Sequence, residues 1–301
     1  MDIIQTIKKN KINYSDILKN NSHILLFDEN EKYDVNIVIA IKNRKEFLPI
    51  VVDSFQKAIK KSNKKICITI ANHEYYPEHL KFCKKNKINY LWVNNKTNGD
   101  FNKSLAYNFG VKFSNKAKFY LLHDVDIIVK QNFFYELYQN IDANTKCLQP
   151  YGKRRVLNLT KELTKKVVKY QIDYNLFNEE TEGVNPPMFN GKPIFGSKGG
   201  SILVDSETFN DVGGFDPELF WGYAAEDQFF FEKIETITNI KYADNPFIDM
   251  FHMWHPPTYN TNPLLYEMEA IYEDFKNMSL NKKMTIINLK KQILLNNETN
   301  Y

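Results

Sequence analysis

Two carboxylates stand one residue apart in an otherwise apolar run, "FYLLHDVDIIV", at residues 119–129. Side chains two positions apart on a strand point to the same side, so Asp124 and Asp126 would face one way. Because an unpaired buried charge is costly, such a pair belongs where a strand ends and faces a crevice. Hard oxygen ligands of this kind favour Mg²⁺ or Mn²⁺. The alternative is a solvated turn that carries two aspartates.

A second group of residues that could do chemistry lies in "GGSILVDSETFNDVGGFDPELFWGYAAEDQFF", residues 199–230. Two glycines precede a strand-like run and would let the backbone approach a ligand closely. Two aromatic residues then lead into two acids at the start of a helix-like run. The helix dipole alone favours acids there, and the other interpretation is a general base beside aromatic platforms, as in carbohydrate chemistry. The residues concerned are Gly199, Gly200, Trp221, Tyr223, Glu226 and Asp227.

The elements that must position these residues alternate between strand and helix patterns. Apolar, β-rich runs predict strands, and apolar residues at helical spacing predict helices. A β-α-β-α order implies an α/β fold, with a mostly parallel sheet covered by helices on both faces. In such sheets ligands bind beyond the carboxyl ends of the strands, where Asp124 and Asp126 lie. The predicted strands are 34–41, 65–72, 88–95 and 119–129, and the predicted helices are 48–62 and 101–115.

Composition narrows the class of protein. The 301 residues are 43% hydrophobic and 25% charged, which is typical of a globular protein with a substantial core. A formal net charge of +4 is too small to indicate a nucleic-acid partner. Three scattered cysteines suit a reducing compartment. No apolar run approaches the roughly 20 residues that span a bilayer, and the N-terminus is too polar for a signal peptide. We therefore expect a cytoplasmic protein, with contact to a membrane surface left open.

Four segments occur in the order in which one enzyme family carries its motifs. The chain resembles metal-dependent glycosyltransferases of the GT-A fold, most closely the β-1,4-galactosyltransferases and related bacterial polysaccharide transferases. The likeness runs from about Val35 to His255. "VNIVIAIKNRKEFL" is similar to the family's first strand and N-R-x-E-x-L turn, and "FNKSLAYNFG" to the helix before its metal motif. "HDVDIIV" is similar to its D-V-D motif, and "GGFDPELFWGYAAED" to its W-G-x-G-G-E-D block.

This resemblance implies a nucleotide-sugar site at the D-V-D motif. Asp126 would be a direct metal ligand, with Asp124 nearer the ribose or sugar of the donor. Cationic side chains at the matching positions would offer charge-assisted hydrogen bonds to phosphates, and Phe101 would pack on the base or ribose. The alternatives are an ordinary exposed turn for Lys42 and Arg44 and a core contact for Phe101. The nucleotide-binding positions are Ala40, Lys42, Arg44, Phe101, Lys103, Asp124 and Val125.

A third metal ligand is expected downstream, in "MFHMWHPPTY". The family uses a histidine after its catalytic helix, and imidazole suits Mn²⁺. His255, in the W-H-P context, is favoured over His252. The other interpretation is that one of these histidines merely packs against Trp254.

The resemblance also implies the reaction. We expect an inverting transfer of a hexose or N-acetylhexosamine (Gal, GalNAc or Glc type) from a UDP-sugar to a glycan hydroxyl, with Mn²⁺ or Mg²⁺ as cofactor. Asp227 would be the base, with Glu226 bound to a sugar. Gly199, Gly200, Trp221 and Tyr223 would line the acceptor or donor sugar. Where the family has two glycines before its two acids, this chain has Ala224 and Ala225, which resist positive φ.

Three other functions compete with this one. The first is a catalytically inactive sugar- or nucleotide-binding module of the same fold, and the retention of Asp124, Asp126, Glu226, Asp227 and a histidine candidate counts against it. A phosphatase of the haloacid dehalogenase type wants Thr or Ser two residues beyond the second acid, where this chain has Ile128. A sugar nucleotidyltransferase needs a Gly-rich loop after the first strand, and "AIKNRKE" contains no glycine.

The domain organisation follows from where the motifs lie. We expect a helical N-terminal extension over 1–33 and a helical tail over 263–301. Between them, a GT-A domain over 34–262 would have a nucleotide-binding half, 34–130, and an acceptor half, 190–258. The segment 151–190 matches no family motif. It contains a basic amphipathic stretch that is either a solvated helical face or a dock for an anionic acceptor or a lipid surface. Its cations are Lys153, Arg154, Arg155, Lys165, Lys166 and Lys169.

Overall fold

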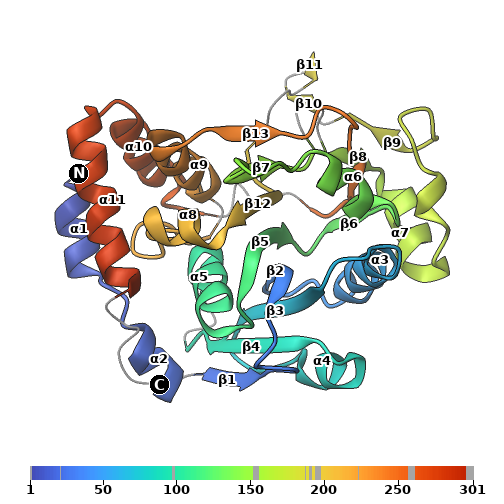
Figure 1. The fold of residues 1–301 in the computed structure, drawn as a ribbon, viewed down its shortest axis with the longest axis horizontal. Helices are drawn as coiled ribbons and strands as arrows, with labels where there is room; N and C mark the ends of the chain where they lie inside the picture. Colours follow the sequence, from blue (N-terminus) through green and yellow to red (C-terminus); the bar gives the residue numbers. More distant parts are fainter. Residues whose placement is uncertain are drawn as a thin grey trace.

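An eight-stranded sheet forms the centre of the molecule, with helices against both of its faces (Figure 1). Its strand order is β1-β4-β3-β2-β5-β12-β7-β13. The structure, a computed structural model, describes residues 2–20, 22–96, 99–151, 156–186, 188–189, 192–193, 198–222, 224–256 and 262–295. The strands of this sheet are β1 (Ser22–Leu25), β2 (Tyr33–Ile41), β3 (Ile66–Glu74), β4 (Asn89–Asn94), β5 (Ala117–Asp124), β7 (Cys147–Gln149), β12 (Ser201–Asp205) and β13 (Ile240–Tyr242).

The pairing of the strands confirms the predicted α/β fold. β2 lies parallel between β3 and β5, β4 is parallel to β3, and β13 is parallel to β7. β12 runs antiparallel between β5 and β7, and β1 runs antiparallel along β4. The sheet is therefore mostly parallel from β2 to β5 and mixed in the half that follows.

Two helices show how the sequence covers the sheet. α3 (Leu48–Lys60) and α5 (Lys103–Phe113) pack into different core clusters, because alternate residues of β2 point to opposite faces. α3 joins the core that contains Ile37 and Ile39, whereas α5 joins the core that contains Val38. Gly110 lets α5 approach closely, since a Cβ there would lie 2.5 Å from Cγ1 of Val38.

A second, four-stranded sheet begins with β6, shortly after the end of β5. Its order is β6-β14-β8-β9. The run 119–129 is consequently not one strand, because β5 ends at Asp124 and the chain changes sheet at the next two residues. The backbone N–H of Asp124 donates to the carbonyl of Gly200 at 2.8 Å, which fixes this corner. The strands are β6 (Ile127–Val129), β14 (Met250–His252), β8 (Leu157–Leu159) and β9 (Val184–Asn185).

The first helix, α1, lies beside the last helix, α11, on one side of the molecule (Figure 1). Ile3 and Ile7 share a buried apolar cluster with Ile286 and Ile287. The predicted helical character of the extension is wrong at β1, which forms because the outer edge of β4 offers unpaired backbone groups. The remaining helices here are α1 (Ile3–Lys9), α2 (Tyr14–Asn20), α8 (Ser206–Asp211), α9 (Glu226–Ile237), α10 (Leu265–Lys276) and α11 (Leu280–Leu295).

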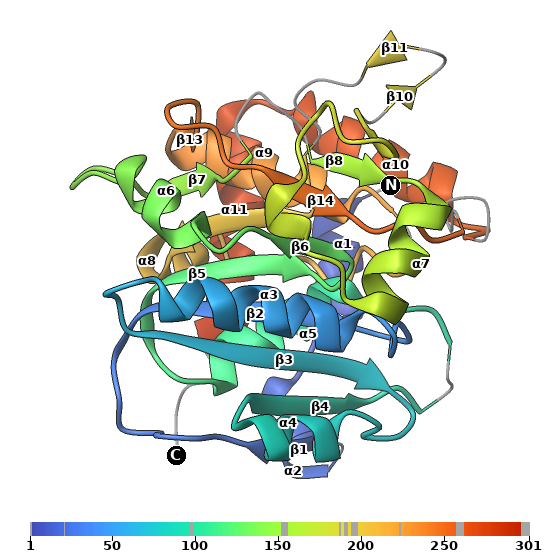
Figure 2. The ribbon, with the colours of Figure 1, turned by 90° about the vertical axis from the view of Figure 1, so that its right-hand side faces the viewer.

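The segment without a family motif forms α7 (Lys161–Tyr170), which lies beside the beginning of α3 (Figure 2). Leu163 and Val167 are buried, whereas Lys165, Lys166 and Lys169 are exposed, so the amphipathic pattern is confirmed there. Lys153, Arg154 and Arg155 lie outside the described residues. No described helix is both long and apolar enough to cross a membrane. The remaining elements are α4 (Leu80–Asn86), α6 (Phe133–Gln139), the 3-10 helix η1 (Tyr174–Leu176), β10 (Met188–Phe189) and β11 (Lys192–Pro193).

Candidate active site

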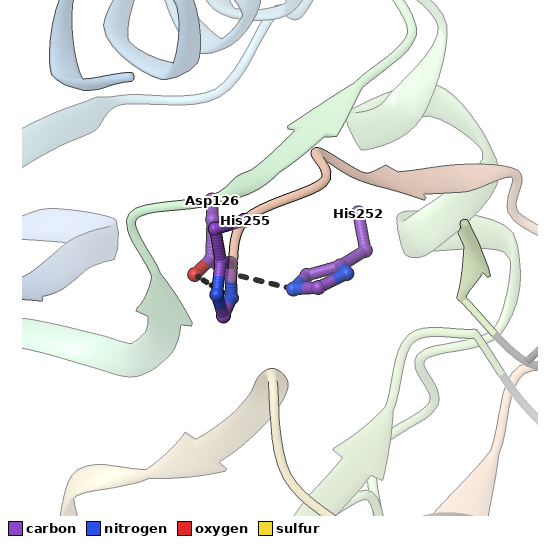
Figure 3. A group of neighbouring side chains, drawn as sticks. All are labelled: Asp126, His252 and His255. Atoms are coloured by element: carbon purple, nitrogen blue, oxygen red, sulfur yellow. Dashed lines mark ion pairs between the residues drawn. The ribbon is translucent and has the colours of Figure 1, made fainter. Parts of the chain in front are cut away.

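Asp126 faces both histidines of the downstream segment. The carboxylate lies 3.2 Å from Nε2 of His255 and 3.7 Å from Nε2 of His252. One ligand atom from each of the three residues falls within 4.8 Å of the others, and Figure 3 shows the side chains pointing toward one another. The four-stranded sheet makes this arrangement, because β14 pairs with β6 directly after Asp126. The structure thus brings together both histidines, where the sequence favoured one.

The far nitrogens of the two rings suit metal ligation. Nδ1 of His255 lies 2.8 Å from the carbonyl of Pro256, and Nδ1 of His252 lies 3.2 Å from Oδ1 of Asn158. A carbonyl oxygen can only accept, so each Nδ1 donates a proton to it, and the Nε2 that faces Asp126 is the nitrogen that can lose its proton and bind a metal. This is the tautomer that metal-bound histidines hold through a second hydrogen bond. One carboxylate and two such imidazoles fit a divalent cation.

Asp126 and His255 shift each other's pKa. Burial alone would raise the pKa of Asp126, but the two histidines and then Arg44 outweigh it and hold that pKa well below its ordinary range. Burial would lower the pKa of His255, whereas its hydrogen bond and ion pair with Asp126 raise it above the ordinary value. A cation at this position would therefore compete with protons on His255.

A second group of charges surrounds Lys103 at the beginning of α5. Nζ of Lys103 lies 2.7 Å from Asp227, 3.2 Å from Glu226 and 3.5 Å from Asp124. The hydroxyl of Tyr107, one turn further along α5, donates to Asp124 at 2.9 Å. Within the described part of the chain, one lysine thus faces three carboxylates.

The two acids at the beginning of α9 both have a raised pKa. Burial raises the pKa of Glu226 to about 7, although Lys103 opposes this. Burial also raises the pKa of Asp227, again against Lys103. Oε2 of Glu226 is buried and has no hydrogen-bond partner among the described residues. Glu226 therefore has a proton affinity suited to acid–base work near neutral pH, and Asp227 is shifted in the same direction.

Gly199 is fitted against Asp227. Its φ is +114°, and a Cβ there would lie 2.4 Å from Oδ2 of Asp227. The hydroxyl of Tyr151 donates to the carbonyl of Gly199 at 2.6 Å and fixes the loop. Gly200, with φ of +77°, carries the carbonyl that receives Asp124. The expected close approach of backbone is thus seen, with the side chain of Asp227 as the neighbour.

The turn after β2 carries two of the residues expected at the phosphates. Asn43 and Arg44 both have positive φ, 58° and 71°, which costs free energy in residues with a side chain. The N–H of Asn43 donates to Oε1 of Glu74, a buried acid at the end of β3, and Nζ of Lys42 donates to the carbonyl of Gly99. Glu74 therefore holds this strained turn in place.

Two of the other predicted residues lie at the same end of the sheet as Asp124. Ala40 lies opposite Asp124 across β2 and β5, and Val125 is buried in the turn between the two acids. The ring of Phe101 lies 6.2 Å from that of His73. Trp221 packs partly against the apolar cluster of the C-terminal helices. Tyr223 lies outside the described residues.

Ala224 and Ala225 stand where the family has two glycines before its two acids, and the backbone here differs accordingly. Gly222 keeps a positive φ of +72°, but Ala225 has φ of −89° and directly precedes α9. The N–H of Gly222 donates to the carbonyl of Phe101 at 2.7 Å, so this block is tied to the segment that leads into α5. The alanines are accommodated because the helix begins directly after them.

Sequence reasoning missed three residues that shape this site: Glu74, Tyr107 and Asn158. A signal existed for Tyr107, because it stands four positions after Lys103 and so shares its helix face. No local signal marked Glu74 or Asn158, whose partners lie 31 and 94 positions away.

Comparison with known proteins supports the fold. No protein-family model matches the sequence, and no curated protein matches it. The structure is similar to residues 1–349 of S. aureus TarS in complex with UDP, at 14% identity over 87% of this chain and 72% of that chain, with a TM-score of 0.53. For TarS in complex with UDP-GlcNAc the values are 12%, 87%, 73% and 0.50.

The catalytic domain of Drosophila β1,4-galactosyltransferase 7 in complex with xylobiose is 15% identical over 83% of each chain, with a TM-score of 0.49. Identities this low speak for the fold alone. The chain has the fold of the GT-A glycosyltransferases.

Proposed function

We propose that this protein is a metal-dependent glycosyltransferase that moves a hexose or N-acetylhexosamine from a UDP-sugar to a hydroxyl of a glycan. The observation that carries this proposal is the pairing of two groups at one edge of the sheet. Asp126, His252 and His255 form a metal-ligand set, and three acids gather around Lys103 beside it. Similarity to TarS, whose structures were solved with UDP and UDP-GlcNAc, supports the choice of donor class.

The donor would lie across the ends of β2 and β5. Asp126, His252 and His255 would hold Mn²⁺ or Mg²⁺, which when bound neutralises negative charge on a diphosphate as a Lewis acid. Arg44 and Lys42 would donate charge-assisted hydrogen bonds to the phosphates. Phe101 would pack on the base or ribose. Lys103, with its three acids, would sit at the sugar end of the donor.

The acceptor chemistry falls to the acids of α9. Asp227 would accept the proton of the attacking hydroxyl, while Glu226 would hydrogen-bond a sugar. The ion pair with Lys103 at 2.7 Å opposes the effect of burial and helps to keep Asp227 ionised. One base on the face opposite the leaving nucleotide would invert the anomeric centre, so an α-linked donor would give a β-linked product.

The test is release of UDP from a panel of UDP-sugars, with Mn²⁺ or with EDTA. We expect release from one sugar, dependent on metal and lost in Asp126→Ala. Asp142→Asn is the control, because Asp142 pairs with Lys241 on an exposed surface. Metal-dependent binding of UDP without turnover, even with acceptors, would instead identify an inactive binding module. Absence of any metal-dependent binding of UDP would overturn the proposal.

A further inference from the structure

A cavity of about 340 Å³ lies between α7 and the turn that precedes α3. This volume is within the range of small-molecule sites. Its apolar walls include Phe47, Val168 and Trp254, and its polar walls include Thr164. The backbone N–H of Trp254 donates to Oγ1 of Thr164 at 2.8 Å, which ties the segment after β14 to α7.

The charged side chains that line this cavity are mostly cationic. Lys161, Lys165 and Lys169 stand four positions apart on α7, so they follow one face of the helix and all line the cavity. Arg44 adds a fourth cation, and Glu46 is the only acid among the described lining residues. Within the described part of the chain, no ion pair joins these three lysines to a carboxylate. Such a surface complements an anion.

The cavity also offers a platform for a sugar ring. Trp254 is 37% exposed, and Nζ of Lys161 lies 4.8 Å from the centre of its ring. An exposed indole can stack on the flat face of a sugar ring, and the neighbouring cations can bind an anionic group on that sugar.

The cavity adjoins the candidate metal centre and lies apart from most of the predicted donor positions. Its wall includes His255, whose Nε2 lies 3.2 Å from Asp126. It also shares Arg44 with the expected phosphate site, but it contains neither Phe101 nor Lys103. A molecule bound here would therefore adjoin the centre where transfer is proposed.

We propose that this cavity is a subsite for a saccharide acceptor that carries a phosphate or carboxylate group, held by the lysines of α7 and stacked on Trp254. This inference rests on the proposed function, since it names the class of acceptor for the same site. The donor diphosphate shares this anionic chemistry, so the experiment must separate the two sources.

The experiment uses calorimetric titration of the full chain, first with UDP and Mn²⁺ and then, with both saturating, with a disaccharide. The probes are maltose and maltose 6′-phosphate, which differ in one anionic group. The variant is Lys165→Ala with Lys169→Ala. Lys166→Ala is the matched control, because Lys166 is exposed on the same helix but does not line the cavity. Alanine preserves the helix in each case.

We expect the phosphorylated disaccharide to bind more tightly than maltose while UDP is bound. The double variant should weaken its binding by at least about tenfold, with Lys166→Ala close to wild type. Equal binding of the two sugars, or equal effects of the two variants, would overturn the proposal. So would binding of the phosphorylated sugar that is seen in a parallel titration without UDP and is lost with UDP saturating, because that would assign the lysines to the donor phosphates.

One further outcome concerns a membrane. If the double variant and Lys166→Ala both lose binding to phosphatidylglycerol vesicles, and neither changes sugar binding, the lysines serve a lipid surface and the proposal fails. Failure of the proposed function would appear separately, as absence of UDP binding in the first titration.

Discussion

Two clusters of charged side chains differ in their balance of charge. Around Lys103, one cation meets three carboxylates, and these side chains are 10 to 28% exposed. Under the C-terminal helices, Lys233 and Lys290 meet Asp216 and Glu218, and all four are at most 1% exposed. Lys233 lies 2.5 Å from Asp216, and Lys290 donates to Glu218.

The difference shows which charges serve the fold. A neutral, fully buried cluster joins α9 and α11 to the loop that leads into the acids, and removal of one partner leaves a charge without compensation. A cluster with excess negative charge is a poor structural device, because its acids repel one another. The excess of negative charge around Lys103 is explained if a bound ligand and the proton of an acceptor hydroxyl compensate for it. The balanced cluster thus positions the loop, and in the proposed function the unbalanced cluster would do the chemistry.

The largest expected effect comes from comparing two Asp→Asn changes. Asp227→Asn should lower transfer by about 10²- to 10⁴-fold, because it removes the base, and should leave the free energy of unfolding unchanged or higher. Asp216→Asn should cost about 3–5 kcal/mol of stability, because Lys233 loses its partner, while the folded fraction stays active. Initial rates and urea denaturation of both variants check this. Loss of both activity and stability in each variant would show that the two clusters do not have separate roles.

A second prediction tests the balanced cluster. Lys290→Met should lower the free energy of unfolding by about 3–5 kcal/mol, since Glu218 is left charged and buried. Adding Glu218→Leu should restore much of this loss. The neighbouring Lys291→Met is the control, because Lys291 pairs with Asp211 on the surface and should cost at most about 1 kcal/mol. Similar losses for Lys290→Met and Lys291→Met, measured by urea denaturation, would contradict the account.

A third prediction concerns the backbone beside the base. Gly199→Ala should lower turnover by about 10- to 100-fold, because the new Cβ displaces Asp227 from its position. Binding of UDP with Mn²⁺ should persist. Gly183→Ala introduces similar backbone strain, at φ of +84° and away from the acids, and serves as the control. Equal turnover in the two variants would show that strain, and not the position of Asp227, limits the rate.

The smallest effect is a pH dependence of stability. Burial raises the pKa of Glu226 to about 7 from a value of 4.5, so its contribution to stability is present below about pH 4.5 and is lost as pH rises through about 7. Glu226→Gln should therefore gain stability over wild type at about pH 8 and little at about pH 5. Glu232→Gln on the same helix, where Glu232 pairs with Lys283, controls for the loss of a carboxylate. A gain that is the same at both pH values would contradict this.

The sequence predicted what local pattern can encode. The strands β2, β3, β4, β5 and β12, the α3 and α5 helices and the position of Asp124 at a strand end all follow from hydrophobic periodicity and the rule for open sheets. The change of sheet between Asp124 and Ile127 was not predicted, because the apolar run continues through the turn and only tertiary pairing with β14 reveals it.

The balanced cluster was also invisible in the sequence. Lys233 and Lys290 occur in helical segments where lysine is ordinarily exposed. Their partners lie up to 74 positions away, from Asp216 to Lys290, so no local spacing marks the pairing. The N-terminal strand β1 was missed for the same reason, since its partner β4 lies far along the chain.

The proposed function depends on a metal that Asp126 and the two histidines hold and that nucleotide binding needs. The affinity of UDP should be measured for wild type and Asp126→Asn, each with Mn²⁺ and with EDTA. We expect Mn²⁺ to tighten UDP binding to wild type by at least about 100-fold and Asp126→Asn to remove this difference. Equal affinity of wild type for UDP with Mn²⁺ and with EDTA would contradict it.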